Sequence, residues 1–317
     1  MKTYYKYTKY FSANFFKKPT IRISNPIYLN DPFESEAGNN LTRVVECSYN
    51  QLDETRRKSR AEIKDALNLM LRSNGIFSVS ETPRNALMWA HYADEHSGLC
   101  IGFDDKVFQK STTMKNHRVL INTLTPQKVN YDNYRFDSQT SIRTKNDMLE
   151  AIKTHLLTKS DDWIYEKEHR WIIPFNLATS FKVDFKHKNQ SSSIMEAMTA
   201  ERLINEALKI KEIDKISDNE FKFNKNTSEA VVAGIATFEC MMFLYEVDPA
   251  CIKSIYMGIR FSDKDTLDLY STINDSKLNL SHINLFKFRL SESRFELIPD
   301  QVNESYISKL IAKKITP

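Results

Sequence analysis

The segment "DDWIYEKEHRWIIP", residues 161–174, sets two glutamates and an arginine at alternate positions inside a stretch that otherwise has the composition of a buried strand. Successive side chains of a strand point to opposite faces, so Glu166, Glu168 and Arg170 are predicted to share one face. Neighbouring carboxylates there would lie about 6.6 Å apart, close enough to serve one ligand. The alternative is an exposed sheet face on which Arg170 bridges both acids, worth roughly 0–1 kcal/mol.

Helical and strand patterns come in uneven groups along the rest of the chain. Helices are predicted at 52–73, 143–158, 193–211, 263–273 and 303–313, and strands at 76–81, 98–104, 127–132, 167–175, 242–248, 252–258, 283–290 and 295–300. This grouping predicts an α+β fold with a mostly antiparallel or mixed sheet, in one domain spanning 1–317. The polar stretch 212–229 is expected to be an irregular excursion. A doubly wound nucleotide-binding fold is disfavoured, because the sequence has no G-x-G-x-x-G or P-loop.

The composition is that of an ordinary globular protein, with 317 residues, 41% hydrophobic, 27% charged and a formal charge of +4. Basic residues are scattered among acids, which indicates solvated helix faces before a nucleic-acid footprint. The four cysteines have no C-x-x-C spacing, so free thiols in a reducing compartment are expected. The N-terminus lacks the apolar core of a signal peptide, and the longest apolar stretch, 230–245, carries Glu239. We therefore expect a cytoplasmic protein without a membrane span.

The segment "ETPRNALMWAHYADEHSGLCIGFD", residues 81–104, predicts a short helix capped by Thr82, with Pro83 at its first position. His91 and His96 are five residues apart, which does not suit two zinc ligands on one helix. The rings of Trp89 and Tyr92 are either core or a surface that stacks on nicotinamide or adenine. Both interpretations stay open.

Two N-terminal motifs also allow a structural and a functional interpretation. In "YLNDPFESE", residues 28–36, Asp31 can cap a turn in a capping-box arrangement with Glu34, or Asn30 and Asp31 can line a pocket mouth. In "YYKYTKY", residues 4–10, Lys6 and Thr8 share a strand face and either hold a phosphate or ribose or belong to an edge strand protected by its lysine.

Together these motifs resemble a known family. In order, "YKYT", "NDPFE", "LMWAHYADEHSGLCIGFD", "YEKEHR" and "IKSIYMGIRFS" resemble the bacterial domain-of-unknown-function family two-nine-seven-one, over roughly residues 4–300. A weaker resemblance links the chain to ADP-ribosyltransferases of the DNA-targeting toxin and RNA 2′-phosphotransferase type. Lys6, Tyr7 and Thr8 match the His-Tyr-Thr-like motif of their first strand, with Lys replacing His. Glu166 and Glu168 match their Glu-x-Glu.

The second resemblance implies an NAD-dependent ADP-ribosyltransferase or NAD glycohydrolase, with an ADP-ribosyltransferase-like split sheet, NAD as substrate and no metal. Glu168 would stabilise an oxocarbenium-like state, Glu166 would orient or deprotonate the acceptor, and Arg170 would keep both acids ionised. The residues expected to bind NAD are Lys6, Tyr7, Thr8, Asn30, Trp89, His91 and Tyr92. The acceptor would be a nucleic acid or a protein, and the setting a toxin or anti-phage defence.

Two other functions are compatible with the same residues. A non-catalytic module could use the aromatic pocket to sense a nucleotide or a phage component. A metal-dependent nuclease could act through Glu166, Glu168 and His91 or His169, although no further Asp/Glu cluster completes a metal site.

Overall fold

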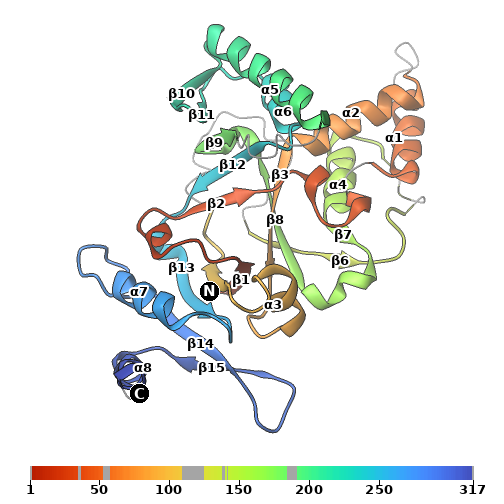
Figure 1. Cartoon of the computed structure of the whole chain (residues 1–317). Coiled ribbons are helices and arrows are strands. Elements are labelled where there is room, and N and C mark those ends of the chain that lie inside the picture. The colour runs from red at the N-terminus through yellow and green to blue at the C-terminus, as the bar shows by residue number, and fades with distance from the viewer. Residues whose placement is uncertain are drawn as a thin grey trace.

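The computed structural model describes residues 2–34, 37–52, 58–108, 125–137, 140, 142–183 and 191–315 (Figure 1). Its helices are α1 (Asn39–Leu52), α2 (Arg60–Arg72), α3 (Ala86–Tyr92), α4 (Lys145–Leu156), α5 (Ser191–Lys209), α6 (Glu229–Ala236), α7 (Asp263–Ile273) and α8 (Glu304–Ile315). Short 3-10 helices include η1 (Ala13–Lys17), η3 (Pro32–Glu34) and η6 (Asp161–Glu166).

The larger of the two main sheets has eight strands in the order β15-β14-β13-β4-β1-β3-β8-β5. Only the β13–β14 pair is parallel among its neighbours. The strands are β1 (Thr3–Thr8), β3 (Asn74–Ser80), β4 (Leu99–Asp104), β5 (Gln127–Lys128), β8 (Glu168–Pro174), β13 (Ile252–Met257), β14 (Asn284–Leu290) and β15 (Leu297–Gln301).

The second sheet has five antiparallel strands in the order β10-β11-β9-β12-β2. They are β2 (Thr20–Ile23), β9 (Ser180–Val183), β10 (Ile213–Ser217), β11 (Glu220–Phe223) and β12 (Met241–Glu246). A small parallel pair, β6 (Asn130–Tyr131) and β7 (Thr158–Lys159), lies beside the first sheet's β8 end (Figure 1).

The first sheet is split at the junction of β1 and β3. These two strands share one register pair, Tyr5 with Ser80, whereas β1 and β4 share six and β3 and β8 share seven. Because so few ladder bonds join β1 to β3, the junction has room for side chains to pass between the strands.

The two faces of the first sheet follow from its registers. Opposed residues of antiparallel strands point to the same side, so Ser78, Ser80, Glu168 and Arg170 share one side, which we call the charged face. The other side, the apolar face, carries Phe77, Val79, Leu99, Ile101 and Trp171.

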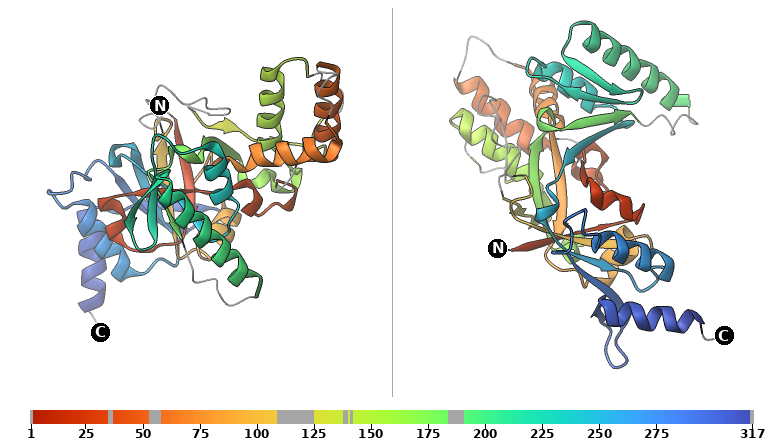
Figure 2. Two further views of the ribbon diagram at one scale, coloured as in Figure 1. Left: turned by 90° about the horizontal axis from the view of Figure 1, so that it is seen from above. Right: turned by 90° about the vertical axis from the view of Figure 1, so that its left-hand side faces the viewer.

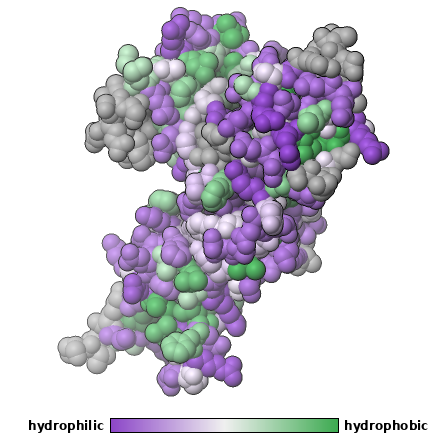
Figure 3. All heavy atoms as spheres, turned by 90° about the vertical axis from the view of Figure 1, so that its right-hand side faces the viewer, coloured by the Kyte–Doolittle hydropathy of each residue, from purple (hydrophilic) through white to green (hydrophobic). Residues whose placement is uncertain are grey.

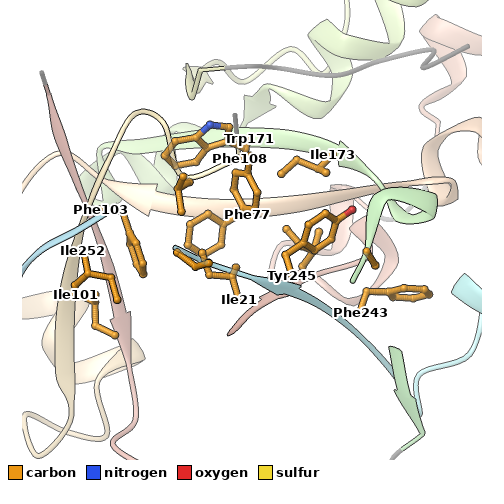
Figure 4. Packing of buried hydrophobic residues seen from close by; sticks show 14 of the residues in the cluster. Ile21, Phe77, Ile101, Phe103, Phe108, Trp171, Ile173, Phe243, Tyr245 and Ile252 are labelled. Carbon is orange, nitrogen blue, oxygen red and sulfur yellow. The ribbon is translucent and has the colours of Figure 1, made fainter. Parts of the chain in front are cut away.

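The apolar face packs against the second sheet in the largest hydrophobic cluster of the described residues. Figure 4 shows Phe77, Phe108 and Trp171 of this cluster close to Tyr245, which comes from the second sheet. The large rings meet edge to face or tilted, as aromatic rings in cores do. This packing fixes β3 and β8 firmly from one side.

Two groups of α-helices cover the two ends of the charged face. At one end α1, α2 and α4 pack over Ile76 and Ile172, and at the other end α3 packs over Tyr7 and Cys100. The right-hand view of Figure 2 shows the α1, α2 and α4 group apart from α3. The charged residues of β8 lie between these two apolar clusters.

The predicted α+β class with a mixed, split sheet flanked by helices is confirmed. The stretch 212–229 is not irregular: β10 and β11 form a hairpin in it, and α6 begins at its end. Of the predicted helix 52–73, the structure has α2 from Arg60, residues 53–57 lie outside the described residues, and α1 precedes it unpredicted. All four cysteines are free, as predicted.

The surface in Figure 3 is mostly hydrophilic, with smaller separate hydrophobic patches. Within the described residues, no helix combines the length and apolar character that crossing a membrane requires.

Candidate functional site

A cavity of about 240 Å³ lies on the charged face, and we call it the central cavity. Strand β1 contributes Tyr5, Lys6 and Tyr7, and β3 contributes Ser78 and Ser80. The ionisable acids and cations that line it are Lys6, Glu34, Lys159, Glu166, Glu168 and Arg170. Three carboxylates and three cations thus meet in one cavity.

Arg170 is the centre of a buried ion network. Its Nε lies 2.7 Å from Glu168 Oε1 and its Nη2 lies 2.9 Å from Glu168 Oε2, a bidentate pair. Nη2 also donates to Glu34 Oε1, and Nη1 donates to the Leu156 carbonyl at 2.7 Å. Arg170 is 1% exposed and Glu168 is 4% exposed, so the predicted alternative of a solvated sheet face is wrong.

Lys159 joins the second glutamate to the same network. Its Nζ lies 2.7 Å from Glu166 Oε2 and 3.5 Å from Glu168 Oε2, and it sits 4.3 Å from the centre of the Trp163 ring. The other oxygen of Glu166 accepts a hydrogen bond from the Tyr92 hydroxyl at 2.6 Å. Lys159, and not Arg170, therefore connects the two glutamates.

The pKa values show which groups keep their charge. Burial alone would raise the pKa of Glu168, but Arg170 and Lys159 outweigh it and hold this pKa at about 2. Burial alone would lower the pKa of Lys159, but the carboxylates of Glu168, Glu166 and Glu34 leave it raised. At Glu34 burial dominates and raises the pKa despite Arg170. Glu168 is consequently a fixed anion at neutral pH.

Glu166 reaches the cavity by a route that strand alternation does not describe. The strand predicted at 167–175 is β8, which begins at Glu168, whereas Glu166 belongs to η6, a 3-10 helix over residues 161–166 that is capped by Ser160. Lys167 then adopts a left-handed conformation with φ of 47°, which turns the chain into β8. The Ser80 hydroxyl donates to the Glu166 carbonyl at 2.7 Å and fixes this turn.

Lys6 occupies the split between β1 and β3. It starts on the apolar face, opposite Ile101, and its Nζ donates to the Ser78 carbonyl at 3.0 Å. The ammonium also lies 5.4 Å from the centre of the Phe77 ring. Burial lowers the pKa of Lys6, and the charges of Glu168 and Glu166 oppose that shift.

The structure brings together most of the residues predicted from sequence. Lys6, Tyr7, Asn30, Tyr92, Glu166, Glu168 and Arg170 all line the central cavity. Asn30 Nδ2 lies 3.3 Å from the Tyr92 hydroxyl, and of the two residues predicted to line a pocket mouth, Asn30 lines the central cavity and Asp31 a different one. Asp31 caps the turn at η3 by accepting from the Phe33 amide, but the predicted capping box is not formed, because the Glu34 carboxylate pairs with Arg170.

Three predicted residues lie elsewhere. Thr8 does not line the central cavity; it lines a different cavity toward η1. Trp89 is fully buried and its Nε1 donates to the Pro83 carbonyl at 2.8 Å, so it is a core residue. His91 is exposed beside the Tyr165 ring. The predicted cap is also wrong, because Asn85 and not Thr82 caps α3.

Sequence reasoning missed two members of the ion network, Glu34 and Lys159. Glu34 had a sufficient local explanation as a capping-box residue, yet it is 136 residues from its partner Arg170 in sequence. Lys159 lies just before the quoted segment, on β7, and no local pattern marks it.

A second cavity of about 260 Å³, the side cavity, shares Glu34 and Lys159 with the central cavity. Among its lining residues, Asp31, Glu34 and His155 each have a buried polar atom without a hydrogen-bond partner. Burial and then Arg135 lower the pKa of His155 to about 4, so this imidazole is neutral at pH 7. Buried polar atoms of this kind call for a ligand or water.

Metal binding would need a further set of ligands. No group of three or more His, Cys, Asp or Glu side chains suited to a metal ion occurs within the described ranges. The nuclease alternative therefore has no ligand cluster to support it in this part of the chain.

The fold and the site define an α+β protein whose mixed, split sheet carries a buried network of acids and cations at a cavity. Residues 88–171, from α3 to β8, match the model of the family described as "Protein of unknown function (DUF2971)". This match confirms the resemblance to that family predicted from the motifs, and the matched segment contains Lys159, Glu166, Glu168 and Arg170. No curated protein and no solved structure matches the chain.

Proposed function

We propose that the central cavity binds the nicotinamide end of NAD and that the protein cleaves the nicotinamide–ribose bond, as an ADP-ribosyltransferase or NAD glycohydrolase. The observation that carries this proposal is the meeting of Glu168, Glu166 and Lys6 in one cavity lined by tyrosines. Each of these groups has a role in such a reaction.

Glu168 would stabilise the positive charge that develops on the ribose. Cleavage of an N-glycosidic bond passes through an oxocarbenium-like state, and a fixed carboxylate beside the ring favours it. Arg170 and Lys159 hold Glu168 in place, and two carboxylate oxygens offer about four acceptor positions in all. A ribose hydroxyl can therefore still donate to Glu168 while the ion pairs persist.

Glu166 would act on the incoming nucleophile. As the nucleophile's oxygen or nitrogen forms a bond to the ribose carbon, nicotinamide leaves with the electron pair of the broken bond, and Glu166 takes the proton. The Tyr92 hydroxyl orients this carboxylate at 2.6 Å. The face of the Tyr92 ring is also available to nicotinamide, a role that the buried Trp89 cannot have.

Lys6 would meet a phosphate. Arg170 and Lys159 are committed to carboxylates, whereas Lys6 has no carboxylate within ion-pair distance in the described part of the chain. An anionic ligand beside it would favour the charged form of Lys6 and pair with it.

The volumes of the central and side cavities suit a ligand that occupies the first and extends into the second. Pockets for drug-sized ligands measure about 300–1,000 Å³, so the central cavity at about 240 Å³ takes only part of a dinucleotide. The adjoining side cavity, about 260 Å³, shares two residues with it and offers space for a further part of the ligand or for the acceptor. A nucleic acid or a protein would be the acceptor, and a toxin or anti-phage defence role fits an NAD-consuming enzyme.

The test is nicotinamide release, measured by mass spectrometry after the purified protein is incubated with NAD in the presence of DNA, RNA or cell lysate. Glu168→Gln keeps the shape of the side chain and removes its charge, so release should fall by at least about 100-fold. Glu81→Gln is the matched control, because Glu81 lies outside the cavity and is partly exposed. Equal release by wild type and Glu168→Gln would overturn the proposal.

The sensing module is the second candidate, and the charge balance of the cavity favours it. Three cations offset three carboxylates, which weakens the negative field that a developing cation would experience. This candidate predicts that NAD binds in calorimetry, that Lys6→Met weakens the binding, and that no nicotinamide is released with any acceptor.

A further inference from the structure

A third cavity, of about 170 Å³, lies where β1, η1, β2 and β4 meet, and we call it the reverse cavity. Its floor is made by buried side chains of the apolar face of the first sheet, Phe77, Leu99, Ile101 and Phe103, together with Phe16 of η1. Figure 4 shows Phe77 near Ile21, with Ile101 and Phe103 beside them. Lys9, Phe11 and Arg22 are exposed at its edge, so the cavity reaches the surface.

The size of the reverse cavity sets the size of its ligand. An apolar cavity of about 150 Å³ lined by Leu, Ile and Phe holds one benzene molecule. The reverse cavity is slightly larger, and its floor has the same kind of apolar lining. Its floor is therefore matched to an apolar body about as large as one aromatic ring.

The charge of the reverse cavity sets the sign of its ligand. Lys6, Lys9 and Arg22 line it, and none of its described lining residues is acidic. Lys9 lies 3.6 Å from Asp94, and Lys6 donates to the Ser78 carbonyl. The backbone of Arg22 pairs with Leu244 in the second sheet, but its side chain has no hydrogen-bond or ion-pair partner among the residues that the structure describes. An anion at the edge would find a guanidinium whose donors are free.

We propose that the reverse cavity binds a small organic anion, with an apolar body the size of one aromatic ring on the floor and a carboxylate paired with Arg22. Binding of the apolar body removes apolar surface of the ligand and of the floor from water, which makes the free energy of binding more favourable. The guanidinium presents a fork of donors that matches a carboxylate. The reverse cavity shares only Lys6 with the central cavity among the described residues, and the proposal does not depend on the proposed function.

The experiment is calorimetric titration of the whole protein with phenylacetate, and with phenethyl alcohol as its uncharged counterpart. Arg22→Gln should weaken phenylacetate binding about five- to tenfold and leave phenethyl alcohol binding unchanged, because only the ion pair is lost. Lys17→Gln is the matched control. Lys17 is an exposed cation of η1 that does not line the cavity, so this variant should bind both molecules as the wild type does.

A second variant tests the floor independently of the charge. Thr8→Phe places a ring at a partly buried residue that lines the cavity, so it should abolish binding of both molecules while thermal unfolding shows a folded protein. Failure of phenylacetate to bind the wild type at millimolar concentration would overturn the proposal. Equal phenylacetate affinity in wild type and Arg22→Gln would overturn it as well.

Discussion

Alternate residues of β8 are buried in two different ways. Those on one face pack against apolar rings, and those on the other form ion pairs. On the apolar face Trp171 packs among the rings of Phe77, Phe108 and Tyr4. On the charged face Glu168 and Arg170 are also buried, and their ion pairs are with each other, with Glu34 and with Lys159. Burial of hydrocarbon stabilises one face by itself, whereas burial of ions is tolerated only when all partners are present.

Of the changes considered, removal of Arg170 should lower the stability of the protein most. Arg170→Met leaves Glu168 and Glu34 buried without their main partner, and the free energy of unfolding should fall by about 3–5 kcal/mol. Denaturant unfolding measures it. Arg72→Met, on a helix away from the cavity, is the control and should change stability by less than about 1 kcal/mol. A loss below about 1 kcal/mol for Arg170→Met would show that the network contributes nothing to stability.

Lowering the pH should weaken the ion pairs of the charged face and leave the packing of the apolar face unchanged. The pKa of Glu168 is depressed to about 2 in the folded state, below an unfolded value of about 4.3, so its stabilisation is present above about pH 5. This stabilisation, about 3 kcal/mol, is lost as the pH falls from about 5 to 2. Because the pKa of Glu34 is raised, Glu34 acts in the opposite direction and regains stability on protonation.

Stability measured from pH 7 to pH 2 in wild type and Glu168→Gln checks this prediction. The difference between the two proteins should shrink as the pH falls. A constant difference over that range would contradict the assignment of a buried, ionised Glu168.

Tyr92→Phe should have a smaller effect on stability, and it tests whether the orientation of Glu166 matters for activity. The hydroxyl donates to a carboxylate and is partly buried, so its loss should cost about 1.5 kcal/mol. If the proposed function holds, nicotinamide release should fall by a larger factor than this stability change implies. Tyr134→Phe, at an exposed tyrosine outside the cavity, should leave both measurements unchanged.

On the apolar face, removal of one methylene should change stability least. Ile173→Val removes a methylene from a side chain that is 1% exposed, and unfolding should become easier by about 1 kcal/mol. The effect should not depend on pH between 7 and 3, since no ionisable group is involved. A pH-dependent loss would show that the two faces are energetically coupled through β8.

Much of this comparison could be predicted from sequence, for physical reasons that differ between residues. Glu168 and Arg170 were found because strand alternation is a local rule that holds throughout β8. Strand alternation placed Glu166 on a strand face with Glu168, but Glu166 belongs to η6, and the left-handed turn at Lys167 that separates it from β8 has no glycine to signal it. Local patterns could not reveal Glu34, because its ion pair is formed only when distant segments meet.

The same distinction applies to the strands: those marked by local composition were predicted, and those that depend on long-range pairing were not. Strands with strong composition, such as β4 and β13, were predicted within a residue of their bounds. The hairpin of β10 and β11 was missed because it is polar and largely exposed, so that hydrophobic alternation barely marks it. Its pairing with β9 is a long-range contact that no short window contains.

The split between β1 and β3 has a consequence for binding at both cavities. Lys6 lines the central cavity and the reverse cavity, so one ammonium group contributes to two binding equilibria. An anion in the reverse cavity that changes the position of this ammonium changes the affinity of the central cavity for its own ligand. By thermodynamic reciprocity, the ligand of the central cavity then changes the affinity for the anion by the same factor. A single side chain in a gap of the sheet thereby links the two occupancies.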